Sequence, residues 1–169
     1  FRRPFYSLIY NNFFHHQNYD IDLVLPAKGF STLARRKKLN NIKKIENKEI
    51  LNIGCGNAFD YHLWFKFKPK KIVGVDVLNY NHSWKQVKKF IKQEKIKTKI
   101  EFYKKDFTKF KYKNKFDFIV SDAVFEHCKD FSRVIKLCSK LLKKDGILYL
   151  TLIQISEPTR RTPNSYAFF

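Results

Sequence analysis

Along most of the chain, short continuous runs of hydrophobic residues alternate with stretches in which hydrophobic residues recur every three or four positions. These runs predict five strands, at residues 50–53, 71–77, 100–103, 116–120 and 147–153. The helical spacing predicts helices at residues 31–47, 59–68, 84–95 and 131–142, the first of them capped by Ser31. Because strands alternate with helices, we expect an α/β fold: a three-layer, Rossmann-like parallel sheet with helices on both faces.

Three segments of the chain differ in character. Residues 1–30 are aromatic and irregular and predict an N-terminal arm, and residues 31–153 form the predicted domain. All lysines lie at or before Lys144, whereas residues 154–169 hold two prolines and the pair Arg160-Arg161. We therefore expect 154–169 to be an atypical tail, either a divergent loop or a non-native sequence.

The 169-residue chain has a formal net charge of +20, which raises nucleic acid as a partner. Lysine outnumbers arginine 28 to 7, however, and the lysines are spread over every predicted element rather than clustered. Because nucleic-acid sites exploit arginine for bidentate contacts, we attribute the charge mainly to compositional bias. RNA stays open as a partner but is disfavoured.

Three scattered cysteines, Cys55, Cys128 and Cys138, form neither a zinc-binding pattern nor a disulfide framework. We therefore expect no metal site and a reducing, cytoplasmic compartment. No hydrophobic run approaches the ~18 residues that a transmembrane helix needs.

Glycine and acidic residues follow the first three predicted strands, at the edge of a parallel sheet where ligands bind. Gly54 and Gly56 follow the first strand, where glycine lets the backbone turn tightly and approach a ligand. Asp76 follows the second strand and could accept hydrogen bonds from the ribose hydroxyls of a nucleoside. Asp106 and Phe107 follow the third strand and could bind an adenine amino group and cover its ring. Taken singly, each position is also compatible with an ordinary turn.

After the fourth strand, the polar segment 121–130 is expected to line the floor of the same pocket. Glu126 and His127 are candidates for a general base, because a carboxylate or an imidazole there could take a proton from an acceptor. The alternative, that both residues only satisfy hydrogen bonds of the loop, is the favoured one.

Together these segments resemble the class I S-adenosylmethionine-dependent methyltransferases, and among them the methyltransferase-11-like group that acts on small molecules and on lipid or sugar intermediates. The matching segments keep the family's order: 50–56, 73–76, 106–107, 116–127 and 142–146. The resemblance implies the strand order 3-2-1-4-5 and S-adenosyl-L-methionine as the cofactor. The cofactor-binding residues that it implies are Asn52, Gly54, Cys55, Gly56, Asp76, Val77, Asp106, Phe107 and Ser121.

In the family's pattern, the two glycines pass under the methionine portion of the cofactor, Asp76 holds the ribose hydroxyls and Asp106 holds the adenine amino group. Two residues depart from that pattern: Asn52 replaces an acidic residue and Ala58 replaces a third glycine. Because asparagine can still form hydrogen bonds, we expect altered cofactor contacts rather than none.

The resemblance implies methyl transfer by direct in-line displacement to a small-molecule or glycan/lipid-intermediate acceptor, without a metal or a covalent enzyme intermediate. Two alternatives stay open: a degenerate domain that binds the cofactor without catalysis, and an RNA-directed methyltransferase. The segment after the fourth strand lacks both an Asp-Pro-Pro-Tyr motif and a Pro-Cys nucleophile, which disfavours methylation of nucleic-acid bases. The sequence identifies neither the acceptor atom nor the oligomeric state.

The class I sheet normally continues after strand five with a helix and two more strands, one of them antiparallel. Only 16 residues follow Ile153, too few for that addition at ~1.5 Å per helical residue and ~3.3 Å per strand residue. We therefore expect strands six and seven to be missing and the edge of residues 147–153 to be uncovered. On that basis the chain by itself is expected to be aggregation-prone and inactive.

Overall fold

The computed structural model describes residues 32–122, 124–128, 130–153 and 163–168. Within them, the strands are β1 (Glu49–Ile53), β2 (Lys71–Asp76), β3 (Lys99–Lys104), β4 (Phe116–Asp122), β5 (Leu142–Ile153) and β6 (Pro163–Phe168). The α-helices are α3 (Thr32–Ile42), α4 (Tyr61–Phe65), α5 (Asn81–Gln93) and α6 (Phe131–Leu141). Two short 3₁₀ helices are η1 (Phe107–Lys109) and η2 (Phe125–His127). The predicted arm 1–30, the predicted cap Ser31 and residues 154–162 lie outside the described residues.

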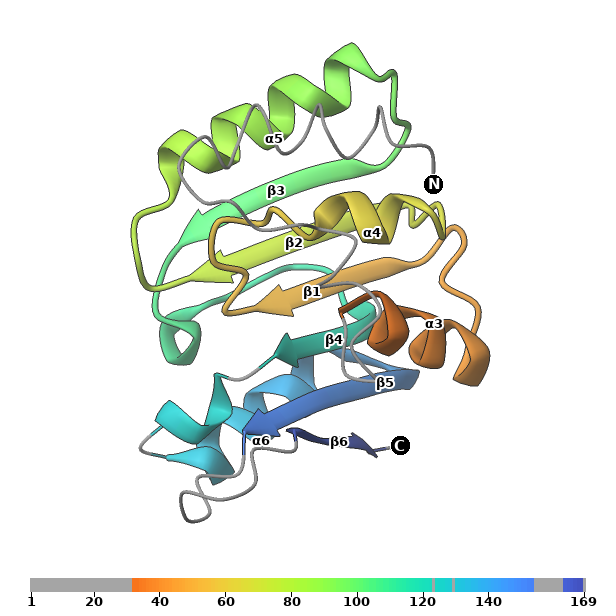
Figure 1. Ribbon diagram of the computed structural model, residues 1–169. Helices are drawn as coiled ribbons and strands as arrows, with labels where there is room; N and C mark the ends of the chain where they lie inside the picture. The colour runs from red at the N-terminus through yellow and green to blue at the C-terminus, as the bar shows by residue number, and fades with distance from the viewer. Residues whose placement is uncertain (1–31, 123, 129, 154–162, 169) are drawn as a thin grey trace.

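The strands of the described residues form one sheet in the order β3-β2-β1-β4-β5-β6. β1 to β5 are parallel, so their carboxyl ends lie at one edge of the sheet, where the arrowheads gather in Figure 1. The chain builds outward from β1 to β3 and then returns to place β4 on the other side of β1. This switch in strand order marks the place where α/β sheets bind ligands. The predicted order 3-2-1-4-5 is confirmed.

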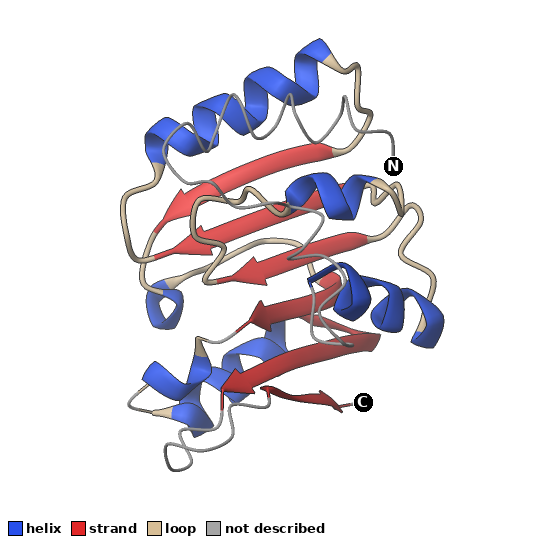
Figure 2. Ribbon diagram, in the orientation of Figure 1, coloured by secondary structure: helices blue, strands red, loops and turns tan. Residues whose placement is uncertain are grey.

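Helices cover both faces of the sheet, as expected for a three-layer α/β fold (Figure 2). On one face, Leu39 of α3, Trp64 of α4 and Trp84 of α5 belong to one buried hydrophobic cluster with side chains of the sheet. On the other face, Val134 and Cys138 of α6 belong to a second cluster. Full burial of a large apolar side chain stabilises a fold by roughly 1.5–3 kcal/mol, so these two clusters hold the helices in place.

Two helices are shorter than their hydrophobic spacing predicts. α3 ends at Ile42 rather than near residue 47. Beyond it, the side-chain oxygen of Asn40 accepts a hydrogen bond from the Ile45 amide at 3.0 Å. α4 covers only Tyr61–Phe65 of the predicted range 59–68, because residues on both sides of it, Ala58 and Lys68, take positive φ angles. No helix in the described part of the chain is long and apolar enough to cross a membrane.

β5 begins earlier than predicted, at Leu142 instead of residue 147, and follows α6 directly. Its pairing with β4 is irregular there, since Phe116 lies opposite Leu142 whereas Phe118 lies opposite Ile147. The extra residues form a bulge that includes the predicted helix-ending segment 143–146. The hydrophobic run from residue 147 onward therefore marks only the regular part of the strand.

The edge of β5 is paired, so the prediction of an uncovered edge is wrong. β6 runs antiparallel to β5, from Leu148 opposite Phe168 to Ile153 opposite Pro163. An antiparallel partner needs only a short connection, so residues 154–162 suffice to return the chain, whereas a parallel strand needs a dozen or more residues. The expectations of aggregation and of inactivity drew on a free edge of β5, and the backbone groups of that edge have a partner strand.

Candidate cofactor site

A cavity of about 660 Å³ opens at the carboxyl edge of the sheet. Its walls come from the segments that follow β1, β2, β3 and β4, and from the first turn of α6. The volume lies within the range of about 300–1,000 Å³ that is typical of small-molecule sites. Six of the predicted cofactor residues line it: Gly54, Gly56, Asp76, Val77, Asp106 and Phe107.

The segment after β1 turns through two glycines in left-handed backbone conformations. Gly54 has a φ of 68° and Gly56 a φ of 52°, angles that residues with a side chain rarely adopt. A Cβ atom on Gly54 would lie 2.2 Å from the Cγ2 of Val124, so this glycine lets the loop pack against the segment after β4. A Cβ atom on Gly56 would meet nothing within 4 Å. Gly54 thus makes room for protein, whereas Gly56 leaves open space beside the cavity.

Asp76, at the end of β2, fixes the glycine loop through its carboxylate. Its Oδ2 accepts a hydrogen bond from the Gly56 amide at 2.8 Å, and its Oδ1 accepts one from the Leu78 amide at 2.9 Å. Each carboxylate oxygen has two lone pairs, so both can accept a further hydrogen bond. Asp76 therefore orients the loop and keeps acceptor capacity for a ligand hydroxyl.

Asp106 caps the short helix η1 with one of its two carboxylate oxygens. Oδ1 accepts hydrogen bonds from the amide and the hydroxyl of Thr108, at 2.8 and 2.9 Å. These hydrogen bonds from Thr108 lower the pKa of Asp106, so the side chain is ionised at neutral pH. Its Oδ2 makes no hydrogen bond to the described residues and can accept one from a ligand amino group. Phe107 begins η1 and lines the cavity beside it.

Asp122, at the end of β4, lines the cavity and is held by two arginines of α3 and by β5. The Nε of Arg35 lies 3.1 Å from its Oδ1, and Arg36 donates to its Oδ2. The hydroxyl of Thr151 on β5 donates to Oδ1 at 3.0 Å. Burial alone would raise the pKa of Asp122, but Arg36 and Arg35 lower it overall. The ionised carboxylate therefore joins α3 to the ends of β4 and β5.

The guanidinium group of Arg36 is almost fully buried, at 1% exposure, and carries its charge between two carboxylates. Besides Asp122, its Nη2 donates to the Oδ2 of Asp60 at 3.1 Å, and the group lies 4.2 Å from the ring centre of Trp64. Burial opposes the charge, but Asp122 and Asp60 raise the pKa of Arg36 overall. Arg36 of α3 therefore also binds the loop before α4, through Asp60.

Asn52, Cys55 and Ser121 lie outside the wall of the cavity. Asn52 is buried and its Nδ2 donates to the Tyr61 hydroxyl at 3.4 Å. Cys55 belongs to the buried cluster under α3, α4 and α5, where burial raises the pKa of its thiol. Ser121 is buried on β4 opposite Ile53 of β1. The cofactor contacts of these three residues stay predictions.

His127 is exposed in η2 and lines the cavity, so it is the candidate general base that the structure brings to the site. The side chain of Glu126 lies outside the described residues. The described residues contain no group of three or more His, Cys, Asp and Glu side chains placed to hold a metal ion.

A sequence model described as a methyltransferase domain matches residues 44–165. The chain belongs to this methyltransferase family. The resemblance to class I S-adenosylmethionine-dependent methyltransferases is thereby confirmed. One curated relative, the ubiquinone biosynthesis O-methyltransferase of Pelagibacter ubique (strain HTCC1062), is 33% identical over 141 residues, which are 83% of this chain and 52% of the relative. The chain thus spans about half the length of that relative.

Solved methyltransferase structures share the fold of this domain. A SAM-dependent methyltransferase from Aquifex aeolicus matches with a TM-score of 0.61 at 19% identity, over 76% of this chain and 69% of that one. Coclaurine N-methyltransferase, bound to N-methylheliamine and SAH, matches with a TM-score of 0.58 at 21% identity, over 71% of this chain and 36% of that one. At these identities the likeness concerns the fold alone.

The cavity of this methyltransferase domain has the chemical features that a nucleoside cofactor needs. The space beside Gly56 is open, and Asp76 and Asp106 supply carboxylate acceptors at the ends of neighbouring strands. Val77 and Leu78 also line it and are 66% and 58% exposed, which offers apolar surface to a flat ring. The residues present therefore fit S-adenosylmethionine.

Several cavity residues lie outside the strand-end segments that the sequence singled out, among them Tyr80 and Arg133. Asp122 lies within the segment 121–130 that was expected to line the pocket, although its carboxylate was not singled out there. Tyr80 and Arg133 lie at the starts of α5 and α6, several residues beyond the strand ends. No local pattern marks them, because the packing of the helices brings them to the cavity.

Proposed function

We propose that this protein transfers the methyl group of S-adenosylmethionine to a small-molecule acceptor by direct in-line displacement. The observation that carries the proposal is the convergence of Gly56, Asp76 and Asp106 on one cavity in a methyltransferase domain. The solved coclaurine N-methyltransferase holds the demethylated cofactor, which supports the same cofactor here.

The protein's contribution is to bind and orient. Bound S-adenosylmethionine supplies an electrophilic methyl group on its sulfonium. Gly56 leaves room for the methionine portion, Asp76 accepts hydrogen bonds from the ribose hydroxyls, and Oδ2 of Asp106 accepts one from the adenine amino group. Because these groups are fixed by backbone hydrogen bonds before a ligand arrives, they hold the reacting atoms in line without further ordering.

We propose a hydroxyl oxygen of a small molecule as the acceptor, since the curated relative is an O-methyltransferase. A hydroxyl group becomes a good nucleophile when a base takes its proton. We assign this role to His127, and its position in the cavity lining on the segment after β4 supports the assignment. Glycan and lipid intermediates that present a hydroxyl group stay within this proposal.

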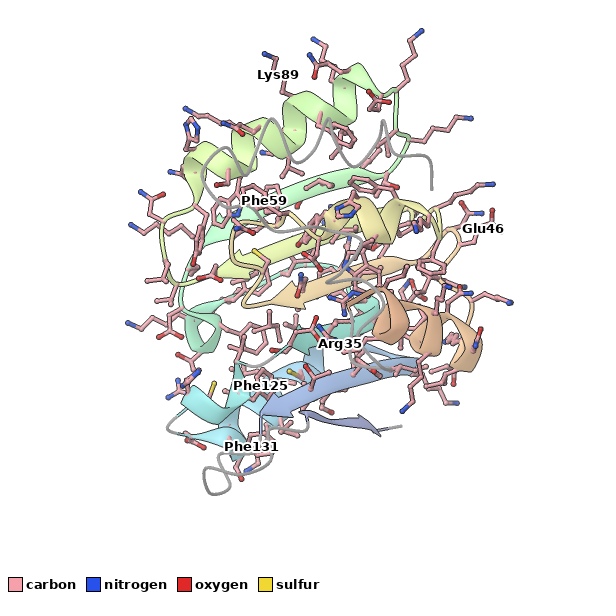
Figure 3. The ribbon with its side chains drawn as sticks, in the orientation of Figure 1. Arg35, Glu46, Phe59, Lys89, Phe125 and Phe131 are labelled. Atoms are coloured by element: carbon pink, nitrogen blue, oxygen red, sulfur yellow. The ribbon has the colours of Figure 1, made fainter. Side chains whose placement is uncertain are left out.

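Neither alternative function gains support. Among the described lysines and arginines, only Lys105 and Arg133 line the cavity, and Lys89 extends from α5 away from the sheet (Figure 3). The excess positive charge is therefore not gathered at the cavity, whereas an RNA-directed enzyme needs basic residues gathered around its site. Asn52, one of the two departures from the family's pattern, hydrogen-bonds Tyr61 outside the cavity wall.

The test is a transfer assay with tritium-labelled S-adenosylmethionine against separate panels of phenols, sugars, isoprenoid phenols and RNA. We expect label on a hydroxyl compound, and a loss of at least about tenfold in rate for His127→Ala with unchanged cofactor affinity. Asp145→Ala, an exposed acidic residue in the β5 bulge, is the control. Transfer to RNA alone, or cofactor binding without transfer to any acceptor, would contradict the proposal.

A further inference from the structure

The glycine loop is held by a tryptophan as well as by Asp76. The indole Nε1 of Trp84, on α5, donates to the carbonyl oxygen of Gly56 at 2.8 Å. The amide of the same glycine donates to Oδ2 of Asp76 at 2.8 Å. The backbone amide and the backbone carbonyl of Gly56 are therefore both fixed by side chains. Since Gly56 has a φ of 52° and no side chain of its own, these two bonds define its conformation.

Aromatic packing fixes the position of the indole donor. Trp84 is 4% exposed, and its ring stacks on Phe102 of β3 with centroids 5.0 Å apart and planes 6° apart. The ring of Tyr80, which also lines the cavity, lies tilted to the same indole with centroids 6.2 Å apart. A buried ring that packs against two aromatic side chains loses little further freedom when it donates a hydrogen bond, so the bond to Gly56 is well ordered.

We propose that Trp84 is a positioning residue for the cofactor: its indole N–H fixes the Gly56 carbonyl and so preorganises the loop that passes under the methionine portion. The inference depends on the proposed function, because the ligand of the loop is the proposed cofactor. A loop ordered in advance raises affinity, since the ligand does not have to order it on binding. Because the indole of Trp84 is hydrogen-bonded to Gly56, its fluorescence is sensitive to changes in the conformation of the loop.

Trp64 provides a matched comparison. It is the other tryptophan of the chain and belongs to the same buried cluster as Trp84. Its Nε1, however, has no hydrogen-bond partner among the described residues. Replacing Trp64 by phenylalanine therefore removes a similar ring without removing a hydrogen bond to the loop.

The experiment measures the affinity for S-adenosylhomocysteine by calorimetry in the full chain, with thermal melting of each variant as a check on folding. Trp84→Phe keeps a ring against Phe102 and removes the donor to Gly56. We expect the Kd to rise about five- to tenfold, the effect of one lost hydrogen bond, whereas Trp64→Phe changes it by less than about twofold. Equal affinities of the wild type and Trp84→Phe would overturn the inference and leave the cofactor proposal intact.

Fluorescence decides the case even if Trp84→Phe does not fold. In Trp64→Phe the emission comes from Trp84 alone, and because the loop is ordered before the ligand binds, the wavelength of its emission maximum should stay constant while calorimetry reports binding. A shift of that maximum along the binding curve, as a loop ordered only by the ligand would give, would overturn the inference. If the folded wild type binds no S-adenosylhomocysteine, the proposed function fails and the inference fails with it.

Discussion

At the scale of single residues, the three glycines near the carboxyl edge have different tasks. A Cβ atom on Gly74 of β2 would lie 2.7 Å from the Tyr61 hydroxyl and 2.8 Å from the Cys55 sulfur, so this glycine makes room for the core beneath the loop. Gly54 makes room for Val124, and Gly56 faces open space. The same residue type therefore serves the fold at two positions and leaves space for the proposed ligand at the third.

This difference predicts that alanine at Gly54 mainly lowers stability, whereas alanine at Gly56 mainly lowers affinity for the cofactor. Gly54→Ala should lower the melting temperature strongly, because its methyl group collides with Val124 and adds to the ~1–2 kcal/mol cost of a left-handed residue. Gly56→Ala should cost only that conformational term, but its methyl group reduces the space for the cofactor, and affinity should fall about tenfold. Melting curves and S-adenosylhomocysteine titrations check both. Gly56→Ala with wild-type affinity would contradict the glycine-loop assignment.

Asp76 has two functions that one substitution removes together. Asp76→Ala deletes the acceptor of the Gly56 amide and the proposed acceptor of the ribose hydroxyls, so cofactor binding should weaken by about 1–3 kcal/mol. Calorimetry on the folded variant measures this, with Asp145→Ala as the control for loss of one negative charge. Unchanged affinity in Asp76→Ala would show that the ribose assignment is wrong.

At the scale of elements, α3 is attached to the sheet through ion pairs in addition to apolar contacts. Arg36 joins it to Asp60 before α4 and to Asp122 after β4. Asp122 lines the cavity, so the position of α3 is coupled to the wall of the site. A helix that precedes the sheet in the sequence therefore helps to shape a cavity built from the strand ends.

The pKa of Asp122 predicts how this attachment depends on pH. Because Arg36 and Arg35 lower the pKa of Asp122 in the folded state, its carboxylate stabilises the fold above the unfolded pKa of about 3.9. The contribution declines as the pH falls through the lower folded-state pKa. Asp122→Asn should lower the free energy of unfolding by about 3 kcal/mol at pH 7, because the buried Arg36 then lacks one of its two carboxylate partners. On acidification, the free energy of unfolding should fall less in Asp122→Asn than in the wild type.

Urea unfolding at pH 7 and below pH 4 measures both quantities, and Asp145→Asn serves as the control. A variant as stable as the wild type at pH 7 would show that the ion pairs do not anchor α3.

The elements show what the sequence could predict and why the rest escaped it. Strands β1, β2 and β4 were predictable because they are mostly buried and their sequences are mainly apolar. β3 is only half-buried to exposed, and its place in the alternation of strands and helices predicted it. β6 was not predictable, since its pairing depends on the free edge of β5 and residues 163–168 carry no continuous apolar run. The end of α3 was missed because the Asn40 side chain, rather than a helical carbonyl group, accepts the hydrogen bond of the Ile45 amide.

The candidate site divides in the same way. Gly56, Asp76 and Asp106 could be predicted because each follows a strand at the ligand-binding edge. Trp84 was recognised only as an apolar position of its helix, since its hydrogen bond to Gly56 spans 28 residues of sequence. Asn52 occupies the position where the family's pattern has an acidic residue, and its side-chain amide donates a hydrogen bond to the Tyr61 hydroxyl inside the core.

At the scale of the whole molecule, the charge of +20 is a property of the surface rather than of the site. Lysines occupy exposed positions on α5, on β3 and in the loops, and few basic residues reach the cavity. The charges are therefore solvated and screened by salt, with a screening length of about 8 Å at physiological ionic strength.

Binding to generic RNA should consequently be weak and should fade between about 50 and 200 mM salt. A filter-binding or fluorescence-anisotropy titration at several salt concentrations checks this, with a DNA duplex of the same length for comparison. Tight, sequence-selective RNA binding at physiological salt would instead make RNA the leading candidate for the acceptor.

The central claim is that the carboxyl edge of this sheet binds S-adenosylmethionine, and calorimetric titration of the folded chain with S-adenosylhomocysteine tests it most directly. We expect one molecule bound per chain, with affinity reduced in Asp76→Ala and retained in Asp145→Ala. A cooperatively folded chain that binds neither S-adenosylhomocysteine nor S-adenosylmethionine would contradict the claim.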